Sequence, residues 1–223
     1  MMGKLIVFEG TDGSGKATQS EMLCARLKRE NIDFRKLCFP RYGEPSCTLV
    51  QMYLDGAFGS KPGDVNAYAA SSFYAVDRYA SYKQDWGKYY KNGGLLIADR
   101  YTTSNAVHQA SKMPLEKRKA FFKWLFDYEY NLLELPEPTL VFYLDMPADV
   151  SEKMLRSRET NTGTQADIHE KDREYLAACR EAGMLAVGEY GWRKVDCARD
   201  GEPRSVDEIH EEIYSAARVL IEK

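Results

Sequence analysis

Short apolar runs recur along the chain, and each is bounded by turn or charged residues. The strongest are Leu5 to Phe8, Gly94 to Ala98 and Thr139 to Leu144, which are rich in aliphatic, β-branched or aromatic residues. Two weaker runs, Phe34 to Phe39 and Trp192 to Val195, bring the number to five. The three strong runs predict strands, and their continuous apolar character is typical of parallel strands buried in a sheet. The two weaker runs, which include charged residues, would be a fourth and a fifth strand.

Stretches with apolar residues at helical spacing separate these runs. Examples are Met22, Ala25 and Leu27 early in the chain and residues 121–128 near its middle. Strands that alternate with helices predict an α/β fold, in which a mostly parallel, five-stranded sheet lies between helices on both faces, as a three-layer sandwich. A chain of 223 residues can form one such unit, so we expect a single domain over residues 1–223.

Composition and charge restrict the classes of function. The chain has 34 acidic and 31 basic residues, so no global basic field attracts nucleic acid or anionic lipid, and any anion site must be local. No apolar run approaches the roughly 18 residues of a membrane span. The five cysteines are scattered without a Cys-x-x-Cys pair, which suits a reducing compartment, and we expect a cytoplasmic protein.

A glycine-rich motif follows the first predicted strand. The segment GTDGSGK, from Gly10 to Lys16, has the form Gly-x-x-x-x-Gly-Lys and precedes a helical pattern, which is the context that a phosphate-binding loop requires. Glycines let successive backbone N–H groups point at phosphate oxygens, and the positive end of the helix adds to the attraction. Lys16 supplies a point charge for the β and γ phosphates. The residues expected to bind ATP are Gly10, Thr11, Asp12, Gly13, Ser14, Gly15, Lys16, Ala17 and Thr18.

One position of this phosphate loop departs from the usual pattern. Ala17 follows Lys16 where a serine or threonine hydroxyl normally reaches the magnesium ion, and Thr18 comes one residue later. Either Thr18 takes part of that role, or Mg²⁺ is held mainly by nucleotide phosphates, waters and carboxylates. The sequence leaves both alternatives open.

Further segments carry a pattern that extends beyond the loop. They are EGTDGSGKATQ, Phe39-Pro40-Arg41, SFYAVDRYAS, ADRYTTSN, LVFYLDMPADVSEKMLRSR and DIHEKDREYL. Together they make the chain resemble thymidylate kinases over nearly its whole length. The resemblance implies a P-loop kinase fold with a short lid at about residues 156–168. It also implies a homodimer and the transfer of the γ-phosphoryl group of ATP, with Mg²⁺, to dTMP to give dTDP.

Two charged residues follow the middle one of the strong apolar runs. Asp99 and Arg100 come at the carboxyl end of a predicted parallel strand, where ligands bind, so Arg100 can reach an acceptor phosphate. The resemblance implies that Arg100 contacts the phosphate of dTMP and that Asp99 orders the magnesium shell. It also implies that Asp12 binds the 3′-hydroxyl of the deoxyribose and magnesium-bound water. Asp167 and Glu170 share one helical face and either add water-mediated contacts to the metal or form a solvated acidic face.

The expected base pocket combines aromatic and hydrogen-bonding side chains. Tyr74 and Arg78 are four residues apart on a predicted helix and therefore share one face. The resemblance implies that they stack on the base and bind its carbonyl, although the stacking residue of the family is usually Phe. It implies too that Phe39 and Pro40 line the thymine pocket, that Arg41 approaches the monophosphate, and that Ser104 and Asn105 bind the base edge. The expected substrate-binding residues are Asp12, Phe39, Pro40, Arg41, Tyr74, Arg78, Arg100, Ser104, Asn105 and His108.

Phosphoryl transfer also requires positive charge at the oxygens of the migrating group. Gly13 occupies the loop position where some family members carry an arginine. We therefore expect Arg156 and Arg158, at the edge of the predicted lid, to close over the γ phosphate, with two solvated arginines as the alternative. The expected catalytic residues are Lys16, Arg100, Arg156, Arg158 and Asp12, and the expected metal-site residues are Asp12, Asp99 and Glu170. No general base is required, because a monophosphate oxygen is already an adequate nucleophile at neutral pH.

Other functions share parts of this pattern. A kinase for another nucleoside monophosphate or for a deoxynucleoside would have the same phosphate loop, Asp-Arg pair and lid. A P-loop module that binds ATP to regulate a partner would need no acceptor site. A guanine-reading Asn-Lys-x-Asp stretch is absent from the sequence, so a GTP-type switch is not expected.

Overall fold

The computed structural model describes residues 2–59, 61–151 and 173–222. Within these residues lie the five predicted strands. They are β1 (Lys4–Glu9), β2 (Arg35–Cys38), β3 (Leu95–Asp99), β4 (Leu140–Asp145) and β5 (Arg193–Asp196). The strand order is β2-β3-β1-β4-β5, and all neighbouring strands are parallel. The predicted α/β fold is therefore confirmed.

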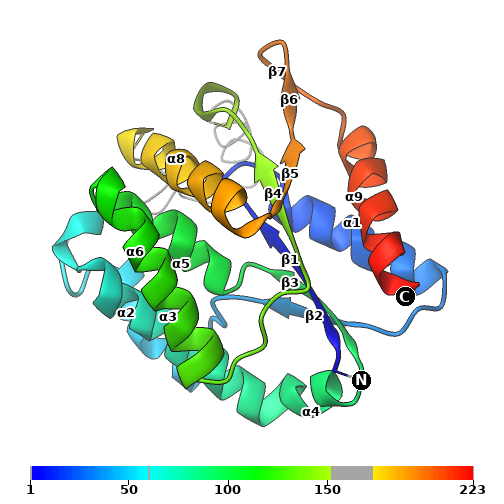
Figure 1. Cartoon of the computed structure of the whole chain (residues 1–223), viewed down its shortest axis with the longest axis horizontal. Coiled ribbons are helices and arrows are strands. Elements are labelled where there is room, and N and C mark those ends of the chain that lie inside the picture. The colour runs from blue at the N-terminus through cyan, green and yellow to red at the C-terminus, as the bar shows by residue number, and fades with distance from the viewer. Residues whose placement is uncertain (1, 60, 152–172, 223) are drawn as a thin grey trace.

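Helices cover both faces of the sheet (Figure 1). The α-helices are α1 (Lys16–Arg29), α2 (Thr48–Leu54), α3 (Ala67–Ser81), α4 (Gly87–Lys91), α5 (Thr102–His108), α6 (Leu115–Phe126), α8 (Arg173–Tyr190) and α9 (Val206–Ile221). Short 3-10 turns span Pro45–Cys47, Pro62–Asp64 and Ala110–Lys112, and π-helical turns span Tyr82–Trp86 and Asp127–Leu132. No described helix is both long enough and apolar enough to cross a bilayer.

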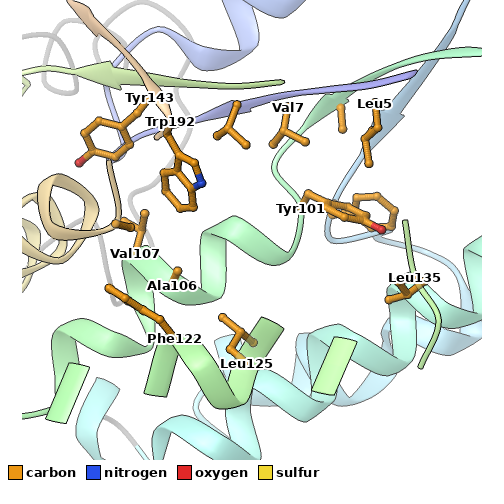
Figure 2. Packing of buried hydrophobic residues seen from close by; sticks show 14 of the residues in the cluster. Leu5, Val7, Tyr101, Ala106, Val107, Phe122, Leu125, Leu135, Tyr143 and Trp192 are labelled. Atoms are coloured by element: carbon orange, nitrogen blue, oxygen red, sulfur yellow. The ribbon is translucent and has the colours of Figure 1, made fainter. Parts of the chain in front are cut away.

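Successive side chains of each strand point to opposite faces, which divides the core into two clusters. In β1, Leu5 and Val7 join the cluster that includes buried side chains of α5, α6 and α8, whereas Ile6 and Phe8 join the cluster that includes those of α1 and α9. Figure 2 shows the first cluster, in which Leu5 and Val7 face the side chains of α5 and α6. The three layers follow from this alternation.

Local signals in the sequence define where several helices begin. Asn66 caps α3, because its side chain accepts a hydrogen bond of 2.9 Å from the amide of Ala69. Ser205 and Glu208 form a capping box at the start of α9, in which each side chain bonds the backbone amide of the other residue.

A small hairpin after β5 is an element that the hydrophobic pattern did not predict. It pairs β6 (Ala198–Arg199) with β7 (Glu202–Pro203) in antiparallel register. Strands of two residues are too short for an apolar pattern. The signal is instead the Asp200-Gly201 pair, whose positive φ angles of 53° and 78° are those of a hairpin turn.

The carboxyl ends of the three strands β1, β2 and β3 meet at one edge of the sheet. The amide of Arg100 donates to the carbonyl of Phe8 at 3.1 Å, and the amide of Phe39 donates to the carbonyl of Asp99, also at 3.1 Å. The segments that leave these strands are therefore held side by side. Ligands of open parallel sheets bind at such an edge.

Candidate active site

The phosphate loop turns sharply at its glycines. Gly10 has φ of 147°, and a Cβ atom there would lie 2.6 Å from the carbonyl oxygen of Leu144 and 2.7 Å from Ser14 Oγ. Gly15 has φ of 89° and precedes α1, which begins at Lys16 without a side-chain cap. The first amides of α1 have no partners within the helix, so they are donors for an anion. Ser14 Oγ is buried and has no hydrogen-bond partner among the described residues.

The Lys16 ammonium lies inside the loop. Its Nζ donates to the carbonyl of Thr11 at 2.7 Å and lies 3.8 Å from Asp12 Oδ1. Burial lowers the pKa of Lys16 to about 8, and nearby Arg100 acts in the same direction, against the carboxylates of the site. A cation that is desolvated in this way gains much from a bound phosphate, because the phosphate replaces the lost hydration.

Arg100 has an unusual backbone for a side chain of its size. Its φ of 66° is in the left-handed region, which costs a non-glycine residue about 1–3 kcal/mol and is concentrated at functional sites. The guanidinium donates to Asp12, contacts His108 Nε2 at 3.0 Å and lies 3.9 Å from Glu9. Burial alone would lower the pKa of Arg100, but the Asp12, Glu9 and Asp99 carboxylates raise it. Arg100 is thus a permanent cation beside the phosphate loop.

Glu9, which the sequence analysis missed, connects the loop to α5. Its carboxylate is fully buried at the end of β1 and accepts hydrogen bonds from the Gly10 amide at 3.0 Å, Thr103 Oγ1 at 2.9 Å and Ser104 Oγ at 2.7 Å. A buried carboxylate needs such partners to offset its desolvation. The signal in the sequence was an acidic residue at the end of an otherwise apolar strand.

A cavity opens beside Asp12 and Arg100, and we call it the acceptor cavity. Its lining residues are Asp12, Phe39, Pro40, Tyr42, Leu54, Tyr74, Arg78, Arg100, Tyr101, Ser104, Asn105, His108, Gln109 and Tyr175. All of the predicted substrate-binding residues except Arg41 are in this set. Five further lining residues were not predicted: Tyr42, Leu54, Tyr101, Gln109 and Tyr175. Tyr101 and Tyr175 lie within the segments ADRYTTSN and DIHEKDREYL that carry the family resemblance, which was the available signal. Arg41 pairs instead with Glu44 at 3.5 Å, and its amide donates to Asp77 at 2.9 Å.

Arg78 is held by a buried carboxylate that was also not predicted. Glu129, on the π-helical turn after α6, accepts from Arg78 Nε at 2.7 Å and from Nη2 at 2.5 Å. Thr102 Oγ1 donates to the same carboxylate at 2.7 Å, and Asn105 Nδ2 lies 3.4 Å from it. Nε and Nη2 of Arg78 therefore both donate to Glu129, and the third guanidinium nitrogen, Nη1, lies 3.4 Å from the carbonyl oxygen of Tyr101.

Aromatic rings form the other walls of the cavity. The ring of Phe39 lies 5.9 Å from that of Tyr101, and Tyr53 meets Tyr74 edge to face at 6.4 Å. Lys112 Nζ donates to the hydroxyl of Tyr53 at 2.7 Å. The stacking candidate Tyr74 is therefore supported from behind by a tyrosine that is itself fixed by a lysine.

The thymidylate kinase family model matches residues 8–213, which is nearly the whole chain. The chain belongs to the thymidylate kinase family. Members of this family are ATP-dependent phosphotransferases, and the phosphate loop and Arg100 described above match that chemistry.

Individual relatives agree with this membership. The thymidylate kinase of Mycobacterium tuberculosis is 29% identical over 190 residues, which cover 84% of this chain and 87% of the relative. The thymidylate kinase of Plasmodium falciparum is 25% identical over 211 residues, covering 95% and 88% of the two chains. The solved thymidylate kinase of Candida albicans superimposes with a TM-score of 0.70 at 19% identity, covering 98% of this chain and 92% of that one. The last comparison supports the fold.

A magnesium ion, which phosphoryl transfer from ATP generally needs, would have to be bound here chiefly through nucleotide phosphates. The described residues contain no group of three or more His, Cys, Asp or Glu side chains that could hold a metal alone. Mg²⁺ in nucleotide sites typically uses one or two carboxylates together with phosphates and waters. Of the predicted metal-site carboxylates, Asp12 and Asp99 lie among the described residues, and both, like the buried Glu9, raise the pKa of Lys16; Asp12 and Asp99 are therefore the described candidates for contact with a metal bound to the phosphates. Thr18 is exposed on α1.

The remaining predicted site residues belong to a segment that the structure leaves out. Arg156 and Arg158, Asp167 and Glu170, and the predicted lid all lie outside the described residues. Their roles stay predictions.

Lys112 provides a pH-dependent test of the wall that supports Tyr74. Burial lowers the pKa of Lys112 to about 8 from its usual 10.5. Between these values the unfolded chain binds more protons than the folded chain, so the free energy of unfolding should rise with pH. Lys16, whose pKa is also lowered to about 8, adds a rise of the same sign, whereas buried thiols such as Cys179 act in the opposite direction, so the test is a comparison of variants. Urea unfolding at several pH values should show that the free energy of unfolding of Lys112→Met, measured relative to the wild type, falls as the pH rises from about 8 to 10.5. Lys119→Met, which removes an exposed lysine, is the control and should keep the wild-type pH dependence; the wild-type pH dependence in Lys112→Met would contradict the assignment.

Proposed function

We propose that this thymidylate kinase phosphorylates dTMP with ATP in the cytoplasm and so supplies dTDP for dTTP synthesis. The observation that carries the proposal is the position of the acceptor cavity. It opens directly beside Asp12 of the phosphate loop and is lined by the cation Arg100. A donor loop and an acceptor cavity that share one edge of the sheet suit the transfer of a phosphoryl group between two bound nucleotides.

The proposed roles of the side chains follow from their places. The loop amides and Lys16 bind the β and γ phosphates, and Arg100 binds the acceptor phosphate and orients it toward the donor. Asp12, which is bonded to Arg100, lies where a sugar hydroxyl of the acceptor would be received. Bound Mg²⁺, held by phosphates and water with Asp12 and Asp99, would neutralise charge on the donor oxygens.

The far end of the cavity suits a neutral pyrimidine base. Tyr74 and Phe39 offer aromatic surface, and the guanidinium of Arg78 retains N–H groups beyond those bonded to Glu129 and Tyr101, which can donate to a carbonyl oxygen. Because Glu129 compensates the charge of Arg78, this end attracts a neutral base rather than a second anion.

We also propose a homodimer, as the family resemblance implies. Helix α3 exposes Tyr68, Val76 and Tyr79, which are apolar surface of the kind that a partner covers.

A panel of acceptors tests the proposed function. ATP turnover should be measured with dTMP, dUMP, dCMP, dGMP and thymidine, each with Mg²⁺. We expect dTMP to give the highest kcat/KM. A preference for dUMP, dCMP or a nucleoside would overturn the thymine assignment, and ATP binding without phosphorylation of any acceptor would indicate the regulatory module.

The two predicted lid arginines can be tested separately from the cavity. Arg156→Ala and Arg158→Ala should each lower kcat by about tenfold, because each variant removes one of several cations around the γ phosphate and leaves the other. The exposed Arg29 on α1 provides the control variant Arg29→Ala, which should turn over normally. If both lid variants kept wild-type kcat while Lys16 variants lost it, the lid assignment would be wrong.

A further inference from the structure

His108 lies at the end of α5, between Arg100 and α8. Its Nε2 is 3.0 Å from Arg100 Nη1. An arginine guanidinium only donates hydrogen bonds, so Nε2 must be the acceptor. The ring is therefore a neutral imidazole that carries its hydrogen on Nδ1. A protonated imidazole would place a second cation against Arg100.

The other side of the ring is fixed by α8. His108 Nδ1 lies 3.4 Å from the hydroxyl of Tyr175 and 3.6 Å from Cys179 Sγ, and both oxygen and sulfur can accept its hydrogen. The Tyr175 hydroxyl also lies 3.1 Å from the backbone carbonyl of His108. Burial raises the pKa of Cys179 to about 12, so this thiol stays neutral and serves as a packing and hydrogen-bonding group.

His108 Nε2 is a neutral hydrogen-bond acceptor for Arg100, beside two carboxylates. The guanidinium already contacts the Asp12 carboxylate and lies near the Glu9 carboxylate. Another carboxylate would orient Arg100 but would also cancel its attraction for an anionic acceptor. The imidazole orients Nη1 without adding negative charge.

We propose that His108 is a positioning residue that holds the Arg100 guanidinium toward the phosphate of the acceptor, and that Tyr175 and Cys179 of α8 select the tautomer of His108 that does so. This inference rests on the proposed function. It replaces the expectation that His108 acts by contact with the substrate alone.

Three variants test the role of His108. Glutamine places an amide oxygen near the position of Nε2, asparagine reaches only the position of Nδ1, and phenylalanine keeps the ring shape without an acceptor. We expect His108→Phe and His108→Asn to lower kcat/KM for dTMP by about tenfold or more, as loss of a hydrogen bond to a charged group does. His108→Gln should recover most of the loss. The KM for ATP and the thermal unfolding midpoint should stay close to wild type.

Two further measurements separate positioning from a general structural role. Calorimetry should show that His108→Phe loses much more affinity for dTMP than for thymidine, which has no phosphate for Arg100 to meet. In a double-mutant cycle, His108→Phe should cost little once Arg100→Gln is present, because the two residues act as one unit.

Each alternative outcome is informative. Equal loss of thymidine and dTMP binding, additive costs with Arg100→Gln, or equal activity of the Gln and Asn variants would overturn the positioning role. The Gln and Asn comparison applies even if His108→Phe does not fold. If the wild-type chain fails to phosphorylate dTMP, the proposed function fails instead, and the same variants are then measured with the acceptor that the wild type does phosphorylate.

Discussion

Replacing Lys16 by methionine is expected to lower kcat for the phosphorylation of dTMP by about 10²- to 10³-fold, the loss seen when one preorganised stabilising group is removed from a transition state. Methionine keeps the length and volume of the side chain, so the loop does not collapse into a void. Burial lowers the pKa of Lys16 to about 8, which means that the folded state disfavours its charge. The thermal unfolding midpoint of Lys16→Met should therefore not fall below that of the wild type.

Lys28, exposed on the same helix, provides the matched control. Lys28→Met should keep wild-type kcat and wild-type ATP affinity in calorimetry with Mg²⁺. If Lys16→Met retained kcat within about twofold, the donor phosphates would have to be held elsewhere. If the folded wild-type chain itself bound no ATP, the kinase assignment would fail with it.

The fold could be predicted because its signals are local. The three central strands are short apolar runs, as in Leu5 to Phe8, and the structure places a strand at each of the five predicted runs, including the two weaker ones at the edges of the sheet. The phosphate loop is equally local, since its glycines and Lys16 lie within seven consecutive residues, Gly10 to Lys16. Their conformation follows from steric rules that hold in any protein. The role of Arg100 could be predicted for a similar reason, because Arg100 directly follows a predicted strand at the edge of the sheet where ligands bind.

The partners of the site residues could not be predicted, because they come from distant parts of the chain. Glu129 lies 51 residues from Arg78, and no spacing rule connects them. The π-helical turn that carries Glu129 also breaks the helical periodicity on which facing residues are usually inferred. His108 was placed in the site, but its contact with α8 joins positions 71 residues apart, as in the pair with Cys179.

Arg41 illustrates the limit of motif spacing in a different way. It follows Phe39 and Pro40, which do line the acceptor cavity, yet its side chain pairs with Glu44. The reason is Asp77, a buried residue of α3 whose carboxylate accepts from the Arg41 amide and from Ser46 Oγ at 2.7 Å. The placement of Phe39 and Pro40 could be predicted from the motif. The placement of Arg41 could not, because it depends on a tertiary contact with Asp77 of α3.

The buried pair of Arg78 and Glu129 gives the largest expected effect on stability. Glu129→Gln should lower the free energy of unfolding by about 3–5 kcal/mol, because it leaves the guanidinium of Arg78 buried without a compensating charge. Arg78 is 1% exposed and Glu129 is 0% exposed, so water cannot replace the lost carboxylate. The amide also presents N–H donors where Arg78 and Thr102 donate. Urea unfolding with linear extrapolation measures the difference.

The exposed pair of Lys119 and Glu189 is the control for this prediction. Its side chains are 60% and 38% exposed, and Glu189→Gln should cost about 1 kcal/mol or less. A loss in Glu129→Gln that is no larger than in Glu189→Gln would mean that the buried charge of Arg78 is compensated by other groups.

A double variant separates the structural role of the pair from its role in the cavity. Arg78→Met combined with Glu129→Leu replaces both charges by apolar side chains, which is often neutral for stability, so much of the loss in Glu129→Gln should be recovered. The same double variant removes the N–H donors of Arg78 from the acceptor cavity. It should therefore fold but bind dTMP weakly, whereas its affinity for ATP stays at the wild-type value. Recovery of stability together with wild-type dTMP affinity would show that Arg78 supports the fold and takes no part in recognising the base.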